Sequence, residues 1–348
     1  MAAAAIGVVS GLITIFNFGE GLFPDKETNS AKFRFKLGYD NTSGRFGPLQ
    51  GAGGAKPDTR IWSPVGEFLG LKINDGNKCP DGDTVCDWKI GGVRLAPEYA
   101  VFSANDDAIC VGVAQTTYPS GENYVHIIGD WAKECSENHG VSHATWYSSR
   151  VYVRAQDHYA KCSWIDKNGD QPSTGFQIHW PEFDGDTASR NTGYYCNSRP
   201  TLHWYTEPDP TAVSFFTRKR DMFARAPSCS VSESPEKDQS GSAIAKRKTG
   251  SSEQFGHQLV KSLLPGQTAS ELCDSRSSAG PSFVSYEERS FCFMVTKTLF
   301  PFCEDVDFGL CWSDELNLVT PKLIDSLVPS MNFTSIGIWD ESNVDIFG

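Results

Sequence analysis

Eleven cysteines constrain this chain more than any other feature of its sequence. They stand at 79, 86, 110, 135, 162, 196, 229, 273, 292, 303 and 311. No two are spaced as Cys-x-x-Cys, so zinc ribbons, zinc fingers and thioredoxin-like motifs have no basis here. Loop settings such as Cys79-Pro80 and Cys86-Asp87 favour disulfides over buried, reduced thiols. We therefore expect a secreted, extracellular protein whose odd cysteine is free or forms an intermolecular disulfide.

The acidic balance of the chain narrows its partners. Its 43 acidic and 31 basic residues give a formal net charge of −12. Such a surface repels phosphate backbones, so we expect no nucleic-acid binding and no polybasic membrane contact. The two sequons, Asn41-Thr42-Ser43 and Asn332-Phe333-Thr334, agree with secretion and predict a glycoprotein.

Residues 1–27 predict a short N-terminal amphipathic helix, the remnant of a processed leader. Met1 to Gly19 carry no charge, yet the basic region of a signal peptide is missing. Ile6, Val9, Ile13 and Phe16 share one helical face, which favours a packed helix. A membrane-active helix is the alternative, but the run is short and glycine-interrupted, so we expect no membrane insertion.

Residues 28–205 carry the pattern of short antiparallel strands. Lys32 to Leu37 alternates charged and bulky side chains, as a half-buried strand does. Turn sequences such as Asn74-Asp75-Gly76 separate the later runs. The strand-like runs lie at 60–62, 67–73, 99–103, 109–117, 124–128, 145–154 and 175–180. This predicts a mostly β fold, an antiparallel β-sandwich or barrel-like domain.

The last two segments differ in character. Residues 206–280 are rich in polar and small residues, which predicts a flexible linker, although 257–264 could form a short helix. Lys219-Arg220 and Lys246-Arg247 are dibasic pairs of the kind that processing proteases cleave, or simply solvated charge. Residues 281–348 regain bulk and hold three cysteines. We expect this segment to be stapled by disulfides and docked on the sandwich.

Several runs resemble a known group of proteins. They are 103–110 (SANDDAIC), 164–170 (WIDKNGD), 174–176 with His179 and 181–183, and 296–303 (TKTLFPFC). These runs, which span both folded segments, are similar to those of secreted cysteine-containing proteins of filamentous ascomycete fungi. The resemblance implies secretion and a fungal source. That group has no assigned activity, so the resemblance implies no catalytic residue.

The best local motif for a ligand is the run from Asp166 to Asp170. Oxygens of Asp166, Asn168 and Asp170 alternate as at the start of a calcium loop, so we name them as candidate calcium ligands. An EF-hand would have glutamate at the twelfth position, where this chain has Gln177. The alternative is a tight Asn-Gly turn between two strands.

Histidines and carboxylates offer weaker candidates. His139 and His143 are four apart, as in a zinc-binding helix, but their surroundings favour a surface loop. His126 and His179 alternate with apolar neighbours, so we expect both to face solvent or a groove. A glycosidase needs two carboxyls across a cleft. Candidates are Asp130, Glu134, Glu182, Asp184 and Asp186.

Adjacent aromatic residues suggest a surface that recognises sugars or proteins. Trp146-Tyr147, Tyr194-Tyr195 and His203-Trp204-Tyr205 could stack on sugar faces or fill partner pockets, or could instead belong to the core. We therefore expect a secreted protein of the binding or effector type that recognises a glycan or a host surface. A secreted polysaccharide hydrolase is the alternative, and a structural cell-wall or spore-surface protein is the second alternative.

Overall fold

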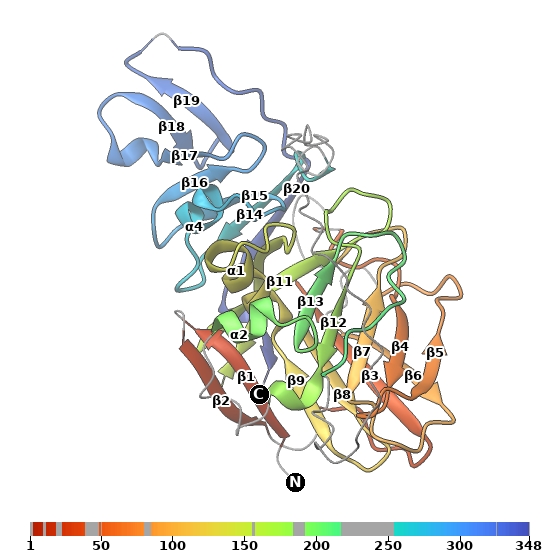
Figure 1. Cartoon of the computed structure of the whole chain (residues 1–348). Coiled ribbons are helices and arrows are strands. Elements are labelled where there is room, and N and C mark those ends of the chain that lie inside the picture. The colour runs from red at the N-terminus through yellow and green to blue at the C-terminus, as the bar shows by residue number, and fades with distance from the viewer. Residues whose placement is uncertain are drawn as a thin grey trace.

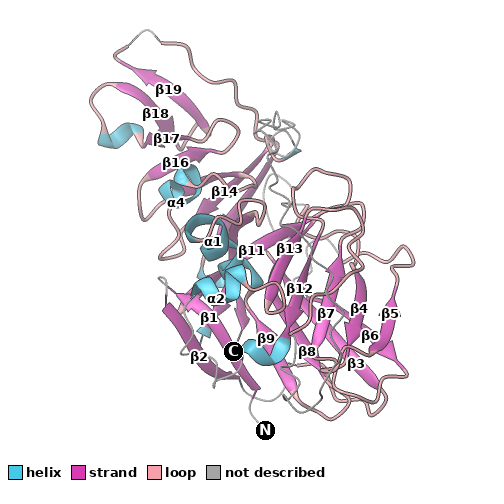
Figure 2. Cartoon of the chain, in the orientation of Figure 1, coloured by secondary structure: helices cyan, strands magenta, loops and turns pink. Residues whose placement is uncertain are grey.

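The protein is mostly β with few helices, which confirms the predicted fold class (Figure 1, Figure 2). The computed structural model describes residues 3–9, 12–18, 23–38, 49, 51–79, 85–154, 157–183, 192–216, 254–324 and 326–347. For residues 3–18 it describes the backbone alone. The described strands form four sheets, two of which enclose the main core.

The first sheet has the order β2-β1-β9-β8-β11-β10-β21, with β3 joined to β8 and β6. Lysine and phenylalanine alternate along β3, so that Phe33 and Phe35 are buried while the charged side chains face outward. The strands are β1 (Ala3–Val9), β2 (Leu12–Phe18), β3 (Ser30–Leu37), β6 (Val85–Gly91), β8 (Ile109–Thr117), β9 (Asn123–His126), β10 (Trp146–Val153), β11 (His158–Ile165) and β21 (Asp345–Phe347).

The second sheet is antiparallel and has the order β13-β12-β7-β4-β5. Its strands are β4 (Asp58–Trp62), β5 (Phe68–Lys72), β7 (Tyr99–Ser103), β12 (Gly175–His179) and β13 (Leu202–Tyr205). Phe35 of the first sheet packs on Phe102 and Phe176 of the second, at ring-centroid distances of 5.0 and 6.0 Å. The two sheets thus share one aromatic core, as in a β-sandwich.

The third sheet is mixed and has the order β17-β16-β15-β14-β20. Its strands are β14 (Gln258–Ser262), β15 (Ser282–Ser285), β16 (Ser290–Phe293), β17 (Thr298–Pro301) and β20 (Ser335–Trp339). The fourth sheet is the hairpin of β18 (Gly309–Ser313) and β19 (Leu318–Lys322), which projects from the far end of the molecule (Figure 1). Phe291 stacks on Trp312 at 4.0 Å and joins the hairpin to the third sheet.

Helices are few and short. Those in the described residues are α1 (Ile128–Asn138), α2 (Thr192–Asn197) and α4 (Ala269–Asp274), with 3₁₀ turns η2 (Trp180–Phe183), η4 (Cys303–Asp305) and η5 (Glu341–Asn343). Helix α1 was not predicted from the sequence, although Trp131, Ala132 and Cys135 form its buried stripe. Gly129 lets α1 lie directly on β11, because a Cβ there would collide with the backbone of Lys161.

The predicted N-terminal helix is wrong. Residues 3–18 form the antiparallel strands β1 and β2, in which Val9 pairs with Leu12 and Ala3 with Phe18. β1 also pairs in parallel with β9. The run is rich in β-branched residues, which favour strands. Strand β9 also offers backbone hydrogen-bond partners to β1, and a helix could not use them.

Residues 206–280, predicted to be a flexible linker, contain the strand β14 and the helix α4. Residues 258–262, where a short helix was considered, form the buried strand β14 between β15 and β20. Residues 206–216 and 254–280 are described, whereas the dibasic pairs at 219–220 and 246–247 lie outside the described residues. At the C-terminal end, β21 pairs with β10, and Asp345 forms a salt bridge of 2.9 Å with Lys36.

Five disulfides cross-link the described residues, which confirms the predicted oxidised cysteines. They are Cys79–Cys86, Cys110–Cys162, Cys135–Cys196, Cys273–Cys292 and Cys303–Cys311. The eleventh cysteine, Cys229, lies outside the described residues, so an intermolecular disulfide stays a prediction. None of the helices in the described ranges combines the length and apolarity needed to cross a bilayer.

Candidate functional site

His126 does not face solvent or a groove, so that prediction is wrong. Its side chain is completely buried and packs on Phe183 and Trp131, at ring-centroid distances of 4.2 and 6.2 Å. Neither ring nitrogen has a hydrogen-bond partner in the part of the chain that the structure describes. Burial lowers the pKa of His126 to about 3. The imidazole is therefore neutral and cannot accept a proton near neutral pH.

His179 is also buried rather than exposed, but it does meet Glu182, as the sequence analysis considered. Its Nδ1 lies 3.6 Å from Glu182, and its Nε2 lies 3.3 Å from Glu98. The Tyr99 ring stacks on the imidazole at 4.1 Å. Burial lowers the pKa of His179, but the two carboxylates outweigh it and the pKa is raised. Tyr194 Oη donates to Glu182, so this cluster is a closed ion-pair network.

The other predicted carboxylates are likewise engaged in the fold. Asp130 accepts from the Lys161 amide and lies 3.1 Å from His158 Nε2. Glu134 accepts from Asn138 and lies 3.3 Å from His139. Asp184 and Asp186 lie outside the described residues. His126, His179, Asp130 and Glu182 therefore do not meet in one site: His126 is buried by itself, Asp130 lies against His158, and His179 lies against Glu182.

The two candidate zinc histidines point to different partners. His139 Nε2 lies 2.8 Å from Thr192 Oγ1, and His143 Nε2 lies 3.1 Å from the Trp204 carbonyl. Within the described ranges, no group of three or more His, Cys, Asp or Glu side chains is arranged to hold a metal ion. This geometry explains both histidines as local hydrogen-bonding groups.

The Asp166 loop forms a capped turn. Asp166 Oδ2 accepts from the amides of Gly169, Asp170 and Gln171, at 3.0, 2.8 and 3.3 Å. Asn168 Oδ1 accepts from the Asp170 amide, so two of the three proposed calcium ligands already stabilise the turn. Burial raises the pKa of Asp166 despite these amides. Calcium binding through Asp166, Asn168 and Asp170 stays a prediction.

The adjacent aromatic residues belong mostly to the core. Trp146, Tyr147, Tyr195, Trp204 and Tyr205 are all buried. They therefore cannot serve as an open platform on which sugar rings stack.

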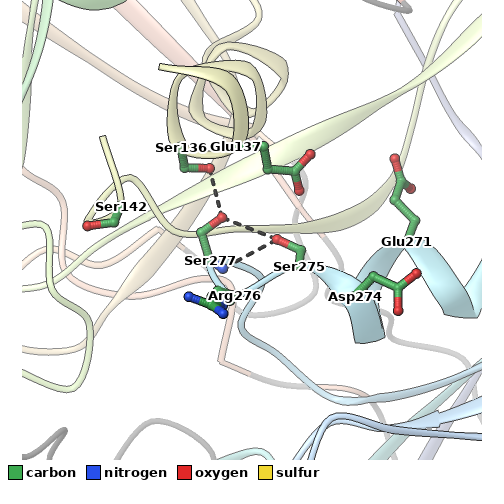
Figure 3. A pocket seen from close by; sticks show the side chains of 8 residues that line it. All are labelled: Ser136, Glu137, Ser142, Glu271, Asp274, Ser275, Arg276 and Ser277. Carbon is green, nitrogen blue, oxygen red and sulfur yellow. Dashed lines mark hydrogen bonds between the residues drawn. The ribbon is translucent and has the colours of Figure 1, made fainter. Parts of the chain in front are cut away.

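A polar hollow of about 570 Å³ lies between α1, the loop at Ser142 and the segment that begins with α4 (Figure 3). We define the polar hollow by its eight lining residues, which are Ser136, Glu137, Ser142, Glu271, Asp274, Ser275, Arg276 and Ser277. It therefore joins the first domain to residues that the sequence analysis assigned to a linker. That assignment is why sequence reasoning missed the hollow.

Serine hydroxyls organise one wall of the polar hollow. Ser136 Oγ lies 2.8 Å from Ser277 Oγ, which lies 3.2 Å from Ser275 Oγ (Figure 3). Ser142 and Asp274 are exposed, and their side chains form no hydrogen bond or ion pair with the described residues. Their oxygens are therefore available to donors on a ligand.

Two lysines fix the carboxylates beside these serines. Lys133 Nζ lies 2.7 Å from Glu137 and 3.5 Å from Glu271, and Lys161 Nζ lies 2.6 Å from Glu271. Both ammonium groups also lie over the Trp146 ring, at 5.4 and 5.6 Å. Burial would raise the pKa of Glu271, but the lysines outweigh it and the pKa is lowered. Glu271 is therefore held as a carboxylate.

The Glu271→Gln substitution should reduce stability in a pH-dependent way. Because the folded-state pKa is lowered, this carboxylate contributes stability above its ordinary pKa, which is lost as the pH falls below it. We expect a loss of about 1 kcal/mol at pH 7 that disappears toward pH 3. Urea unfolding across this pH range measures the difference. The matched control is Glu304→Gln, whose ion pair with Arg289 is exposed and should matter little; equal losses in both variants would contradict the prediction.

Comparisons with known proteins add no further constraint on the site. No protein-family model, curated protein sequence or solved structure matches this chain.

Proposed function

We propose that this is a secreted, extracellular binding protein that recognises a glycan through the polar hollow. The observation that carries the proposal is the hollow itself, where hydroxyl and carboxylate oxygens from two parts of the chain converge. Glycans present many hydroxyl donors, which suits a hollow lined by hydroxyl and carboxylate oxygens. Five disulfides support an oxidising compartment. Exposed Asn332 remains a predicted glycosylation site.

Binding is favoured over hydrolysis because of the state of the hollow's carboxylates. A glycosidase needs one carboxyl with a raised pKa to protonate the leaving oxygen. Glu271 has a lowered pKa, and Glu137 is held by Lys133 at 2.7 Å. Glu271 is therefore not suited to act as the general acid. The groups are suited instead to accept hydrogen bonds from an unreacted ligand.

The Asp274→Asn substitution should weaken glycan binding. Replacing the exposed carboxylate removes a charge-assisted hydrogen bond, which typically contributes about 1.5–3 kcal/mol, or roughly 10- to 100-fold in Kd. Neutral and amino-sugar oligosaccharides on an array identify the ligand, and calorimetry with the strongest binder gives Kd for each variant. Asp307→Asn is the matched control, because Asp307 is exposed and lies just before β18, outside the polar hollow.

Three results separate the alternatives. Weaker binding by Asp274→Asn alone supports the proposal, whereas equal binding by both variants moves the site away from the hollow. Turnover of the same oligosaccharides in a parallel hydrolysis screen would favour the polysaccharide hydrolase. Neither binding nor turnover would leave the structural wall or spore-surface role.

A further inference from the structure

The outer face of the second sheet carries a second, independent feature. Strand alternation sends Trp62, Tyr99, Val101 and Tyr205 away from the main core, where they form a separate buried cluster. Residues 210–216, which we name the strap, run across this cluster. The outer face and the strap share no residue with the polar hollow.

Side chains of the sheet hold the backbone of the strap. The Gln177 amide makes a pair of bonds with one residue: Oε1 accepts from the Ser214 amide, and Nε2 donates to the Ser214 carbonyl, both at 2.8 Å. Tyr205 Oη donates to the Ala212 carbonyl at 2.7 Å, and Tyr99 Oη accepts from the Phe216 amide at 3.2 Å. All of these bonds are made to backbone atoms of the strap, so they do not depend on the strap's side chains.

Aromatic contacts add the side-chain part of the recognition. The Phe215 ring packs edge-on against Tyr99 and Trp62, at 5.0 and 6.4 Å, and the Phe216 ring packs on His179 at 5.4 Å. Phe215 and Phe216 are only partly buried. The outer face therefore offers two aromatic subsites beside a row of peptide-binding groups.

The strap is not part of the sheet's hydrogen-bonded ladder. Residues 210–216 form no strand, and no backbone–backbone hydrogen bond from them is recorded in the described part of the chain. A strand of the sheet would be held by such bonds. The strap is held instead by side chains of the sheet, which bind its peptide groups.

We propose that the outer face of the second sheet is a peptide-binding groove, occupied by the strap of the same chain. Its ligand is a peptide with two adjacent aromatic residues. The residue before them must offer its backbone N–H and carbonyl to Gln177, as Ser214 does before Phe215 and Phe216. The tethered strap competes at a high effective concentration, so a peptide in solution binds only when the strap is weakened.

The experiment uses the full chain with Phe215→Ser and Phe216→Ser together. The probe is a fluorescent synthetic peptide with the sequence of residues 209–216 (DPTAVSFF), and fluorescence polarisation measures Kd. We expect the double variant to bind at least tenfold more tightly than the wild type. Adding Gln177→Ala should remove at least tenfold of that affinity, and a peptide with alanine at both aromatic positions should not bind.

A matched control and a second variant keep the test decisive. Phe308→Ser changes an exposed aromatic residue just before β18 and should leave peptide binding at the wild-type level. If the double variant fails to fold, Ser214→Pro releases the strap instead, because proline has no backbone N–H to donate to Gln177 Oε1. A folded variant of either kind that binds the peptide no better than the wild type overturns the proposal.

Discussion

Replacing both Cys110 and Cys162 with alanine is expected to lower the free energy of unfolding by about 4 kcal/mol. This disulfide joins β8 to β11 across 52 residues of sequence, and both cysteines are completely buried. In the chain-entropy model, opening such a long loop restores much conformational freedom to the unfolded state. Urea unfolding followed by tryptophan fluorescence, under non-reducing conditions, measures the loss.

The matched control is the pair Cys79 and Cys86, which lie only 7 residues apart. The same model gives a loss of about 2.5 kcal/mol for so short a loop. The long-loop variant should therefore unfold at a clearly lower urea concentration than the short-loop variant. Equal midpoints would show that loop entropy does not govern the contribution of these cross-links.

Local patterns predicted the strands best where one face of a strand is buried. The alternation of Lys32 to Leu37 gave the strand that the structure has as β3, because one face of β3 lies on the aromatic core. The same reasoning failed for residues 3–18, where Ile6, Val9, Ile13 and Phe16 fit a helical face and the chain forms two strands. The spacing of apolar residues cannot distinguish helix from strand here, because β1 is a strand that pairs with β9, which lies over 100 residues away in the sequence.

Strand β14 shows a second limit of sequence reasoning. Gln258 to Ser262 mixes polar and apolar residues, yet all five are buried because β15 and β20 flank them in parallel. Parallel partners come from distant parts of the chain, so a strand buried in this way leaves only a weak local signal. The polar residues around it therefore suggested a linker.

The His179 cluster and the polar hollow were harder to predict than the strands, because tertiary contacts bring their residues together. His179 and Glu182 are three residues apart and could be paired from the sequence, whereas Glu98 joins them from the start of β7. The polar hollow combines α1 with residues after α4, about 140 positions later in the chain. Composition suggests polar surface at both places but cannot show that they meet.

Replacing His126 with leucine should stabilise the protein, most strongly in acid. The pKa of this buried imidazole is lowered to about 3, against an ordinary value of 6.5. Between pH 3 and pH 6.5 the imidazole binds a proton in the unfolded state but not in the folded state. The free energy of unfolding is therefore highest above pH 6.5 and decreases as the pH falls. At pH 5 this loss is about 2 kcal/mol, since one pKa unit corresponds to about 1.4 kcal/mol.

Leucine at position 126 removes both that loss and the two unpartnered ring nitrogens, while keeping a side chain of comparable size between Phe183 and Trp131. We expect the stability difference between pH 7 and pH 5 to shrink by about 2 kcal/mol relative to the wild type. Urea unfolding at the two pH values measures it. His257→Leu is the control, because it makes the same substitution at an exposed histidine. An unaltered pH dependence in the His126 variant would mean that the imidazole takes up a proton in the folded state, which requires that water reach the core beside α1.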